Sequence, residues 1–456
     1  MLPYAFDLRK FIEHLTRNNE LHTIAVPVSL TLELARITER VSKAHGPALC
    51  FSAPQPAALP ILTNLFGSPR RAAWALGAAD EDLSLLTERL ILLLQGESGS
   101  AAQRLEVLCR GIKYRLVPPC WQEVGGELAE LPFLQAWPDD GGSYLTLPLV
   151  VTRHPESGRI NWGIYRVQRS SDGSLLIHWK EGSGAAAHAR AWQERGEPMP
   201  VAIVLGAPPA LLWAAAAPLP AGVDEAAFVG LLAGEALPLS RCVTLDLLVP
   251  AVAEVVLEGH VVPGDVGREG PFGNHSGSYA PTALVPRLRL AALHRRRDCC
   301  IAATVVGPPP MEDCYLAALT PQLFLPLLRI DCPEIVALAM PIEGIFHGCA
   351  LVAADPMGDG AGLLARLRNS DLLRRSRLLI LFGPEVNVHD YAAAFWRALN
   401  AVDLQRDLTI LPGIGLNIDA SRPLPQPLFP DPQIVAQVAA RANDYGLPAS
   451  WFVNSK

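Results

Sequence analysis

The sequence lacks the marks of several protein classes. Its nine cysteines include no Cys-x-x-Cys pair, which argues against a disulfide framework and against a thiolate metal site. No apolar run reaches the roughly 20 residues of a membrane-spanning helix, and the start of the chain has no basic region followed by an apolar stretch. These absences predict a cytoplasmic protein without a membrane span.

An excess of positive charge is also lacking. Lysine and arginine number 38 against 45 aspartates and glutamates, which gives a net charge of −7. The longest basic run, His294–Arg297, is followed directly by Asp298. Because nucleic-acid binding relies on a clustered basic face, nucleic acid is not predicted as a partner.

The length of 456 residues indicates roughly two to four domains. Alternating helical and extended patterns predict an N-terminal α/β domain over residues 1–112 and a second α/β domain over residues 301–425. Closely spaced strand patterns over residues 113–300 predict a β-barrel or packed sheets. Residues 426–456 are predicted to form a linker and an amphipathic helical arm of the kind that docks on a neighbouring subunit.

Several elements can be placed within these parts. Asp7 is the predicted N-cap of a helix whose apolar face includes Leu8 and Leu15. The apolar run Leu378–Phe382 is typical of a parallel strand that is covered on both faces. One helix, beginning near Asp224, is expected in the central part. The strands expected there are Tyr144–Thr152, Asn161–Gln168, Leu175–Trp179, Val201–Leu205, Val243–Val249 and Ala253–His260.

The segment Arg268–Gly277 carries the strongest functional signal. Its glycines and proline predict a stiff turn with positive φ angles or a close approach to a ligand, so that Glu269 and Asn274 are presented in a fixed geometry. A plain surface turn would explain the glycines and the proline, but not the whole pattern.

Two separated motifs together resemble one protein family. Residues Asn161–Gln168 resemble the Asn-x-Gly-x-Tyr-Arg-x-Gln strand of the UbiD family of decarboxylases, and Glu269–Gly273 resembles the acidic turn of the same family. Further matches follow in the family's order along nearly the whole chain, and the terminal segment resembles the arm of the 3-polyprenyl-4-hydroxybenzoate decarboxylases. The further matches are Asp7–Ile12, Asn64–Arg71, Gly307–Asp313 and Val386–Asp390.

The resemblance implies a fold and a chemistry. The fold would be an N-terminal α/β lobe, a central flavin-reductase-like split β-barrel that holds prenylated FMN, and a C-terminal α/β lobe, assembled as dimers or hexamers. The reaction would be decarboxylation of an aromatic, heteroaromatic or α,β-unsaturated acid. The flavin is the electron sink, and a flavin prenyltransferase supplies it.

The resemblance also names site residues. Arg166 on a strand needs a partner if it is buried, and Glu269 is the natural candidate; a purely structural ion pair would look the same from sequence. The matching family residues lie beside the flavin. The positions that the resemblance assigns to cofactor binding are Asn161, Ile164, Tyr165, Arg166, Gln168, Gly182, Ser183 and Glu269.

At Asn274 the chain departs from the family. Relatives carry Glu or Asp there as the proton donor, whereas an amide has no titratable proton near neutral pH. A positioned general acid contributes about 10²–10⁴-fold to a rate. Either another group replaces it, with His275 as the simplest substitute, or the reaction is different or absent.

The metal and phosphate positions depart as well. Of the three residues that bind the family's Mn²⁺ or Mg²⁺, only Asn161 is retained, since Gly182 and Pro238 stand at the other two positions. Such a site is therefore expected only if another donor has moved into place; the candidates are Glu181, His188 and Glu235. A phosphate-binding lysine is also missing after residue 413, and Arg422 is the nearby substitute.

Two functions remain in competition from the sequence. The first is a UbiD-like carbon–carbon lyase in which Arg166, Glu269 and Asn274 line the site. The second is a homologue that has lost the normal cofactor and metal and serves as a non-catalytic binding or assembly subunit, or that catalyses a reaction other than decarboxylation. Four further residues are interpreted as structural, with Glu312 and Asp313 favoured by a helix start; the other two are His347 and His389.

Overall fold

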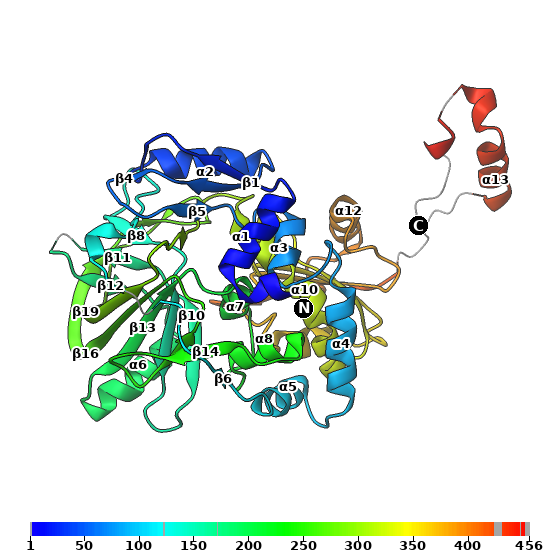
Figure 1. Cartoon of the computed structure of the whole chain (residues 1–456). Helices are drawn as coiled ribbons and strands as arrows, with labels where there is room; N and C mark the ends of the chain where they lie inside the picture. The colour runs from blue at the N-terminus through cyan, green and yellow to red at the C-terminus, as the bar shows by residue number, and fades with distance from the viewer. Residues whose placement is uncertain (1, 122–123, 171, 424–430, 447, 452–456) are drawn as a thin grey trace.

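The structure is a computed structural model, and it describes residues 2–121, 124–170, 172–423, 431–446 and 448–451. Three sheets of four strands or more give a mixed α/β architecture (Figure 1). In this part of the chain, no helix combines the length and the apolar character needed to cross a membrane. The predicted linker falls partly on residues 424–430, which lie outside the described residues.

The N-terminal sheet is mixed and includes a strand from far along the chain. Its order is β1-β3-β5-β20, and β5 pairs parallel to β20. Asp7 caps the first α-helix as predicted, because its carboxylate accepts hydrogen bonds from the backbone of Arg9 and Lys10. The elements are α1 (Leu8–Arg17), β1 (Leu21–Ile24), β2 (Val28–Ser29), α2 (Glu33–Lys43), β3 (Ala48–Phe51), β4 (Pro54–Gln55), β5 (Ile61–Thr63), α3 (Pro69–Ala75) and β20 (Ile301–Ala302).

A group of helices packs against the N-terminal lobe and shares its buried apolar core. Helix α10 packs on α4 and α5, while α7 packs on α8 and on strand β10. These helices and the short α9 share one large buried cluster with the N-terminal lobe. Their bounds are α4 (Ser84–Gln95), α5 (Ala101–Arg110), α7 (Pro209–Ala216), α8 (Glu225–Ala233), α9 (Glu312–Ala318) and α10 (Thr320–Asp331).

The central sheet is antiparallel and curls into a half-barrel, at the left of Figure 1. Its order is β10-β9-β13-β16-β19-β12-β11-β8, with β7 paired to β19. Register shifts interrupt the pairing of the two longest strands, β16 and β19, and such bulges bend strands. The strands are β7 (Val124–Gly125), β8 (Ser143–Leu145), β9 (Leu149–Arg153), β10 (Ile160–Ile164), β11 (Val167–Arg169), β12 (Leu175–Ile177), β13 (Met199–Leu205), β16 (Val255–Glu269) and β19 (Ala283–Arg295).

Several predictions for the central part are wrong. The predicted strands Tyr144–Thr152 and Asn161–Gln168 are each divided, into β8 and β9 and into β10 and β11. Three helices intervene there, not one, because α6 (Gly184–Arg195) and α7 join the expected α8. The predicted strand Val243–Val249 is mostly a turn, since the buried Glu258 carboxylate accepts hydrogen bonds from the backbone of Val243 and Thr244. The strands on either side of that turn, together with β6, form a three-stranded sheet. They are β6 (Arg115–Leu116), β14 (Pro238–Arg241) and β15 (Leu248–Pro250).

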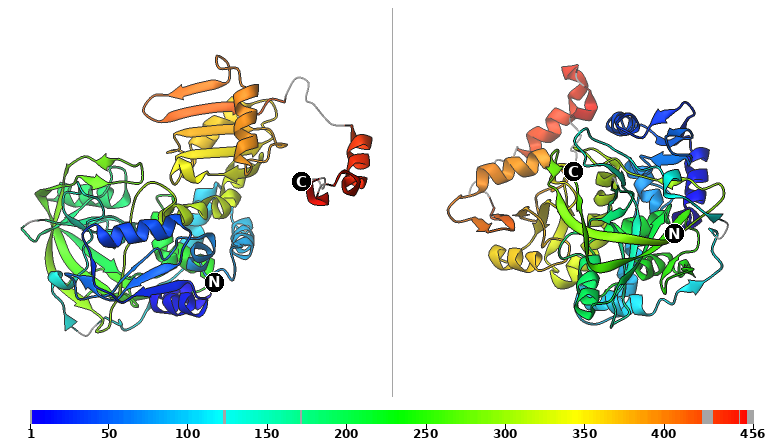
Figure 2. Two further views of the ribbon diagram at one scale, coloured as in Figure 1. Left: turned by 90° about the horizontal axis from the view of Figure 1, so that it is seen from above. Right: turned by 90° about the vertical axis from the view of Figure 1, so that its left-hand side faces the viewer.

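The C-terminal sheet has the order β21-β22-β23-β25-β24. The prediction for β23 (Leu378–Phe382) is confirmed, because both of its neighbours are parallel and its alternate residues pack against different helices. Helix α13 (Pro432–Ala440) stands away from the body (Figure 2). The other elements are β21 (Ile335–Ala339), β22 (Cys349–Ala354), α11 (Gly360–Arg368), α12 (Tyr391–Ala401), β24 (Leu408–Leu411) and β25 (Gly415–Ala420).

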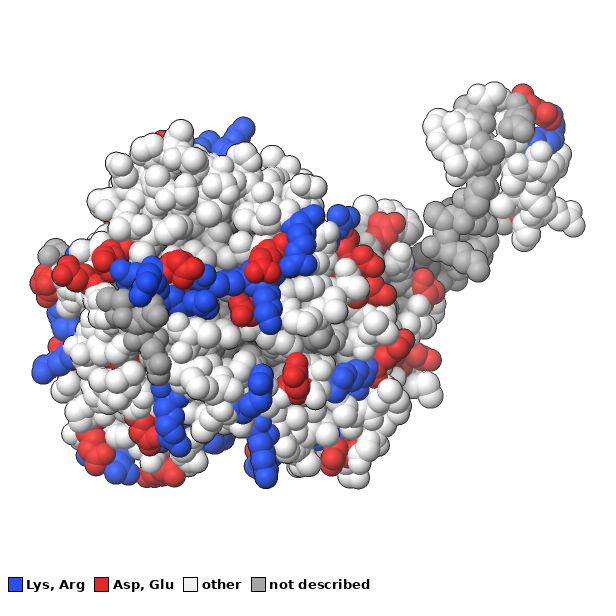
Figure 3. All heavy atoms as spheres, viewed as in Figure 1, with Lys and Arg blue, Asp and Glu red and all other residues white. Residues whose placement is uncertain are grey.

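Charges of both signs are mixed on the face drawn in Figure 3. Acidic side chains accompany the basic ones along the band that crosses the middle of this view. Arg9 in α1, for example, pairs with Glu254 and with Asp298. On this face charges of the two signs are therefore interspersed.

Candidate functional site

An arginine, a glutamate and a histidine meet at the ends of strands β11, β12 and β16 of the half-barrel. Arg166 Nε donates to Glu269 Oε1 at 2.7 Å, and its Nη2 donates to Oε2 at 3.0 Å. His178 Nδ1 lies 2.9 Å from Glu269 Oε2. The predicted pairing of Arg166 with Glu269 is therefore present, and the Glu269 side chain is 0% exposed.

Strand pairing explains why these three side chains meet. Strands β11 and β12 form a hairpin in which Val167 pairs with Ile177, so the next positions, Arg166 and His178, face one another. The His178 amide donates to the Arg166 carbonyl at 3.1 Å, which extends the ladder by one step. Glu269 is the last residue of β16.

Sequence reasoning missed His178, although a local signal was present. Asp172-Gly173 lies between the two predicted strands, and this dipeptide is a strong hairpin signal. With Asp172 and Gly173 as the two central residues of the turn, residue 178 would lie opposite residue 167, whereas the observed register places it opposite residue 166, one step away. Because a shift of one residue moves a side chain to the other face of the sheet, the dipeptide predicts the hairpin but not that the histidine lies beside the arginine.

The electrostatics favour an ionised Glu269. Burial alone would raise its pKa, but the hydrogen bonds from His178 and Arg166 and the charge of Arg166 hold that pKa below its usual value. The Arg166 guanidinium also lies 4.3 Å from the centre of the Phe272 ring, a cation–π contact. The site therefore holds a buried carboxylate that stays charged near neutral pH.

The acidic turn is held in place by Gln168. Its Nε2 donates to the Gly141 carbonyl at 2.7 Å, and its Oε1 accepts from the Gly270 amide at 3.0 Å. Gly270 has a φ of +90°, which favours glycine at that position. The buried amide of Gln168 thus bridges two backbone groups and fixes the direction of the turn, and its predicted role in cofactor binding stays a prediction.

Asn274 is engaged within its own turn. Its Oδ1 accepts a hydrogen bond from the His275 amide at 2.7 Å. The His275 ring packs edge-on against Phe346, with 4.8 Å between ring centres. Burial, and then the charges of Lys180 and Arg377, lower the pKa of His275 to about 4. His275 is therefore neutral near pH 7 and is a poor substitute for the missing acid.

Several predicted cofactor-binding residues gather where β10 meets α6. The buried Asn161 donates from Nδ2 to the Tyr165 hydroxyl at 3.4 Å. Ser183 caps α6 by accepting from the Ala186 amide. A Cβ on Gly184 would lie 1.9 Å from Asn161 Oδ1, so the amide packs directly over the first residue of the helix. Ile164, at the end of β10, is half-buried.

The donors present do not fit a divalent metal ion. Gly182 is exposed, and Pro238 belongs to β14, so neither offers a side-chain ligand. Two of the proposed replacements, Glu181 and Glu235, are also exposed. The third, His188, is buried with Nδ1 2.9 Å from Thr152 Oγ1. Within the described residues there is no group of three His, Cys, Asp or Glu side chains that could hold a metal.

The remaining candidate residues lie in different parts of the fold and differ in burial. Glu312 and Asp313 lie in the first turn of α9, as predicted, and burial raises their pKa values to about 7 and about 6. His389 is exposed, whereas His347 Nε2 is buried without a hydrogen-bond partner among the described residues. Arg422 follows β25 and lies 3.7 Å from Asp407.

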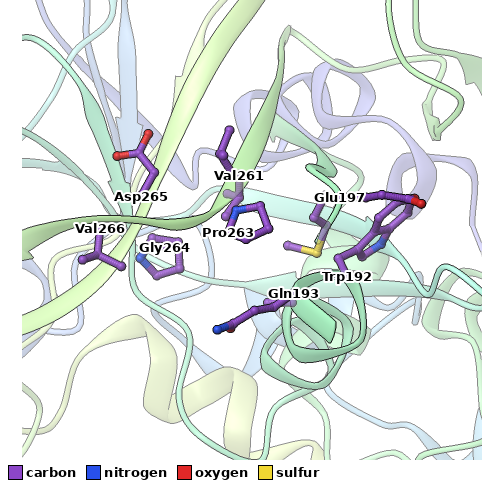
Figure 4. Close-up of a pocket in the computed structure, with 12 residues that line it drawn as sticks. Trp192, Gln193, Glu197, Val261, Pro263, Gly264, Asp265 and Val266 are labelled. Atoms are coloured by element: carbon purple, nitrogen blue, oxygen red, sulfur yellow. The ribbon is translucent and has the colours of Figure 1, made fainter. Parts of the chain in front are cut away.

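Two small cavities are found among the described residues, and only the second of these borders the site. The first, of about 80 Å³, lies between the end of α6 and the bend of β16, and it contains none of the predicted site residues (Figure 4). Its carboxylates are already paired, Glu197 with Arg195 and Asp265 with Arg289. The second, of about 140 Å³, is mostly apolar and borders the acidic turn through Phe346. It is lined by Cys314, Ala317, Ala318, Met340, Ile342, Phe346 and Tyr391.

The sequence matches three family models that together span most of the chain. They describe the N-terminal, Rift-related and C-terminal domains of 3-octaprenyl-4-hydroxybenzoate carboxy-lyase and match residues 12–90, 115–309 and 314–427. An uncharacterized protein of Archaeoglobus fulgidus is 36% identical over 416 residues, which cover 89% of this chain and 86% of that protein. An uncharacterized protein of Aquifex aeolicus is 35% identical over 423 residues, covering 89% and 87%.

Solved structures share the fold. The closed form of vanillic acid decarboxylase from Sedimentibacter hydroxybenzoicus aligns with a TM-score of 0.84 at 24% identity, covering 96% of this chain and 98% of that one. An evolved dimeric form of the UbiD-class enzyme HmfF from Pelotomaculum thermopropionicum, in complex with prFMN, aligns with a TM-score of 0.79 at 24% identity, covering 94% and 98%. At this level of identity the likeness establishes the architecture.

Proposed function

The chain belongs to the UbiD family of carboxy-lyases, and from this premise we propose that it is a decarboxylase that uses prenylated FMN. The substrate class is an aromatic, heteroaromatic or α,β-unsaturated carboxylic acid. The observation that carries the proposal is the wholly buried Glu269 carboxylate, paired with Arg166 and His178 at the ends of strands β11, β12 and β16. A buried ion pair adds little net stability to a fold, because the cost of burying two charges offsets their attraction. Its presence here is therefore better explained by a role in the site.

The residues that would hold the flavin surround this pair. We propose that the half-barrel is a flavin-reductase-like split barrel, with Asn161, Ile164, Tyr165 and Ser183 along one side of the cofactor. The orphaned Nε2 of His347 fits a bound ligand, because buried polar atoms normally find a partner. When bound, the prenylated flavin supplies the electron sink for the carbon that loses carbon dioxide.

Arg166 and Glu269 then have separate roles. Glu269 fixes the guanidinium through Nε and Nη2, while Nη1 makes no hydrogen bond within the described part of the chain. Nη1 can therefore hold an acceptor oxygen of the flavin or of the substrate carboxylate. The ionised Glu269 orients both Arg166 and His178.

We propose that His178 returns the proton that the residue at position 274 cannot supply. We assign a proton to Nδ1 of His178, which lies 2.9 Å from Glu269 Oε2 and 3.2 Å from Arg166 Nη2, so that Nε2 is the atom that carries the transferable proton. When carbon dioxide leaves, the electron pair that remains on the substrate carbon takes this proton, and His178 is reprotonated from solvent. Its side chain is 22% exposed, which gives water a route to the ring.

The apolar cavity beside the turn supports the substrate class. Phe346 and Tyr391 are aromatic, and the other lining residues are small or apolar. Ligand sites of this kind bind flat carbon skeletons by burial and orient them with a few polar groups. We propose that the acid's carbon skeleton lies in this cavity.

Assembly is part of the proposal. Exposed large apolar side chains on α12 and in the C-terminal arm, such as Trp396, Leu399 and Trp451, fit a homo-oligomer, either a dimer or a hexamer. A flavin prenyltransferase would supply the cofactor.

The test is to co-express the chain with a flavin prenyltransferase and to assay a panel of such acids for carbon dioxide release and for deuterium exchange at the reacting carbon. His178→Gln should retain flavin and KM but lower kcat and exchange by about 10²–10⁴-fold. His389→Gln, at an exposed histidine, is the matched control. Purification without flavin, or flavin without turnover of any acid, would favour the non-catalytic reading instead.

A further inference from the structure

Three cationic side chains gather on the side of the site where the metal donors are missing. Arg375 Nη2 donates to the Gly182 carbonyl at 3.4 Å. Lys180 precedes Gly182 by two residues, and its charge acts on His275 together with that of Arg377. The charge of Arg375 acts in turn on His347. The cations thus come from two lobes, and Arg375 of the C-terminal lobe reaches the loop that follows Lys180.

None of these cations is neutralised in the described part of the chain. No ion pair joins Arg375, Arg377 or Lys180 to an acidic side chain there, although neighbouring arginines such as Arg374 have one. All three are exposed. Like charges repel one another, so a cluster of this kind fits an anion that lies between them.

The backbone conformation at Gly182 leaves room for the Arg375 guanidinium. Gly182 has a φ of +77°, where residues with a side chain are strained, and a Cβ there would point to within 4.0 Å of Arg375 Nη2. A histidine ligand at this position would therefore need a different backbone, and the nearest heavy atom to its Cβ would be the Arg375 Nη2. Asn161, the single retained donor, lies close by over Gly184.

We propose that this chain anchors the flavin phosphate without a divalent cation, and that Arg375 takes the place of the metal. The inference rests on the proposed function, because it concerns the same cofactor. A guanidinium can bind two phosphate oxygens at once through parallel N–H groups, and it stays charged at any physiological pH. Lys180 and Arg377 supply the remaining positive charge.

The experiment measures the affinity of the full-length protein for FMN, which carries the same phosphate, by fluorescence titration with EDTA or with added Mn²⁺ or Mg²⁺. Metal content is measured in parallel. We expect equal FMN affinity under all conditions and much less than one metal ion per chain. Arg375→Ala should weaken FMN binding about 10- to 100-fold, the usual effect of losing a charged hydrogen bond. It should not change the binding of riboflavin, which has no phosphate.

Arg374→Ala is the matched control, because Arg374 is the adjacent arginine and already pairs with Asp371. It should bind FMN as the wild type does. Loss of FMN binding in EDTA, or unchanged FMN affinity in Arg375→Ala, would overturn the inference and leave the proposed function standing. If the wild type binds neither FMN nor prenylated FMN, the proposed function fails, and the inference fails with it.

Discussion

The buried Glu269 makes a prediction about stability as a function of pH. Replacing Arg166 with methionine removes the bidentate partner of a carboxylate whose side chain is 0% exposed. Removing one member of a buried pair costs about 3–5 kcal/mol, because the other charge stays buried. A cooperative unit of about 150–250 residues, such as the predicted central part over residues 113–300, loses roughly 2–4 °C per kcal/mol. The melting temperature of that unit should therefore fall by about 6–20 °C at pH 8.

The sign of the pH dependence follows from Glu269. In the wild type its folded-state pKa is lowered, so its contribution is present above the unfolded-state pKa of about 4.3 and is lost only in acid. In Arg166→Met, burial is the largest remaining effect, and it raises the folded-state pKa above that of the unfolded chain. Stability of the variant should therefore fall as the pH rises, and the difference from wild type should be larger at pH 8 than at pH 5.5.

The assay is thermal unfolding of both proteins at pH 5.5 and pH 8. The double variant Arg166→Met, Glu269→Gln should lose the extra pH dependence, because no carboxylate remains to titrate. Arg17→Met, which removes an arginine that is 72% exposed from its pair with Glu13, should change little at either pH. An equal loss at both pH values, or a loss below about 1 kcal/mol at pH 8, would refute the view that Arg166 holds a buried charge.

Two further predictions concern α6. Gly184→Ala should destabilise the protein by about 1–3 kcal/mol, because the new Cβ would lie 1.9 Å from Asn161 Oδ1, whereas Gly125→Ala, which meets no atom within 4 Å, should not. His188 has its pKa lowered to about 4, first by burial and then by His154, so the unfolded chain binds its proton first and stability falls as the pH drops below about 6.5. His188→Gln should remove about 2 kcal/mol of the loss between pH 7.5 and pH 5, seen as a flatter melting profile, while His389→Gln leaves the profile unchanged.

The sequence was sufficient for the parts that local patterns determine. The N-cap at Asp7 and the parallel strand Leu378–Phe382 are both present. The ion pair between Arg166 and Glu269 is also present, but its partners are 103 positions apart, and the family resemblance, not a local pattern, indicated it. The Asp172-Gly173 dipeptide indicates the hairpin that contains His178, but the register that sets this histidine opposite Arg166 is known only from the structure. The division into four parts stays a prediction, as do the assigned roles of the site residues.

The errors and omissions have long-range causes. The turn that replaces the predicted strand Val243–Val249 exists because Glu258, in another strand, binds its backbone. Arg375 reaches Gly182 across 193 positions of sequence, so no local pattern connects them. The role of Gln168 in bracing the acidic turn likewise depends on Gly141 and Gly270, which lie in separate segments.

Strand β20 has a consequence for synthesis on the ribosome. The amides of Ile301 and Ala303 donate to the carbonyls of Pro60 and Leu62, so β5 has its second neighbour only after that distant strand has been translated. Until then the nascent chain carries β5 with an unpaired side, and such edges invite pairing with other chains. Early release of a truncated product would leave that edge permanently open, which makes fragments ending before residue 301 prone to aggregate.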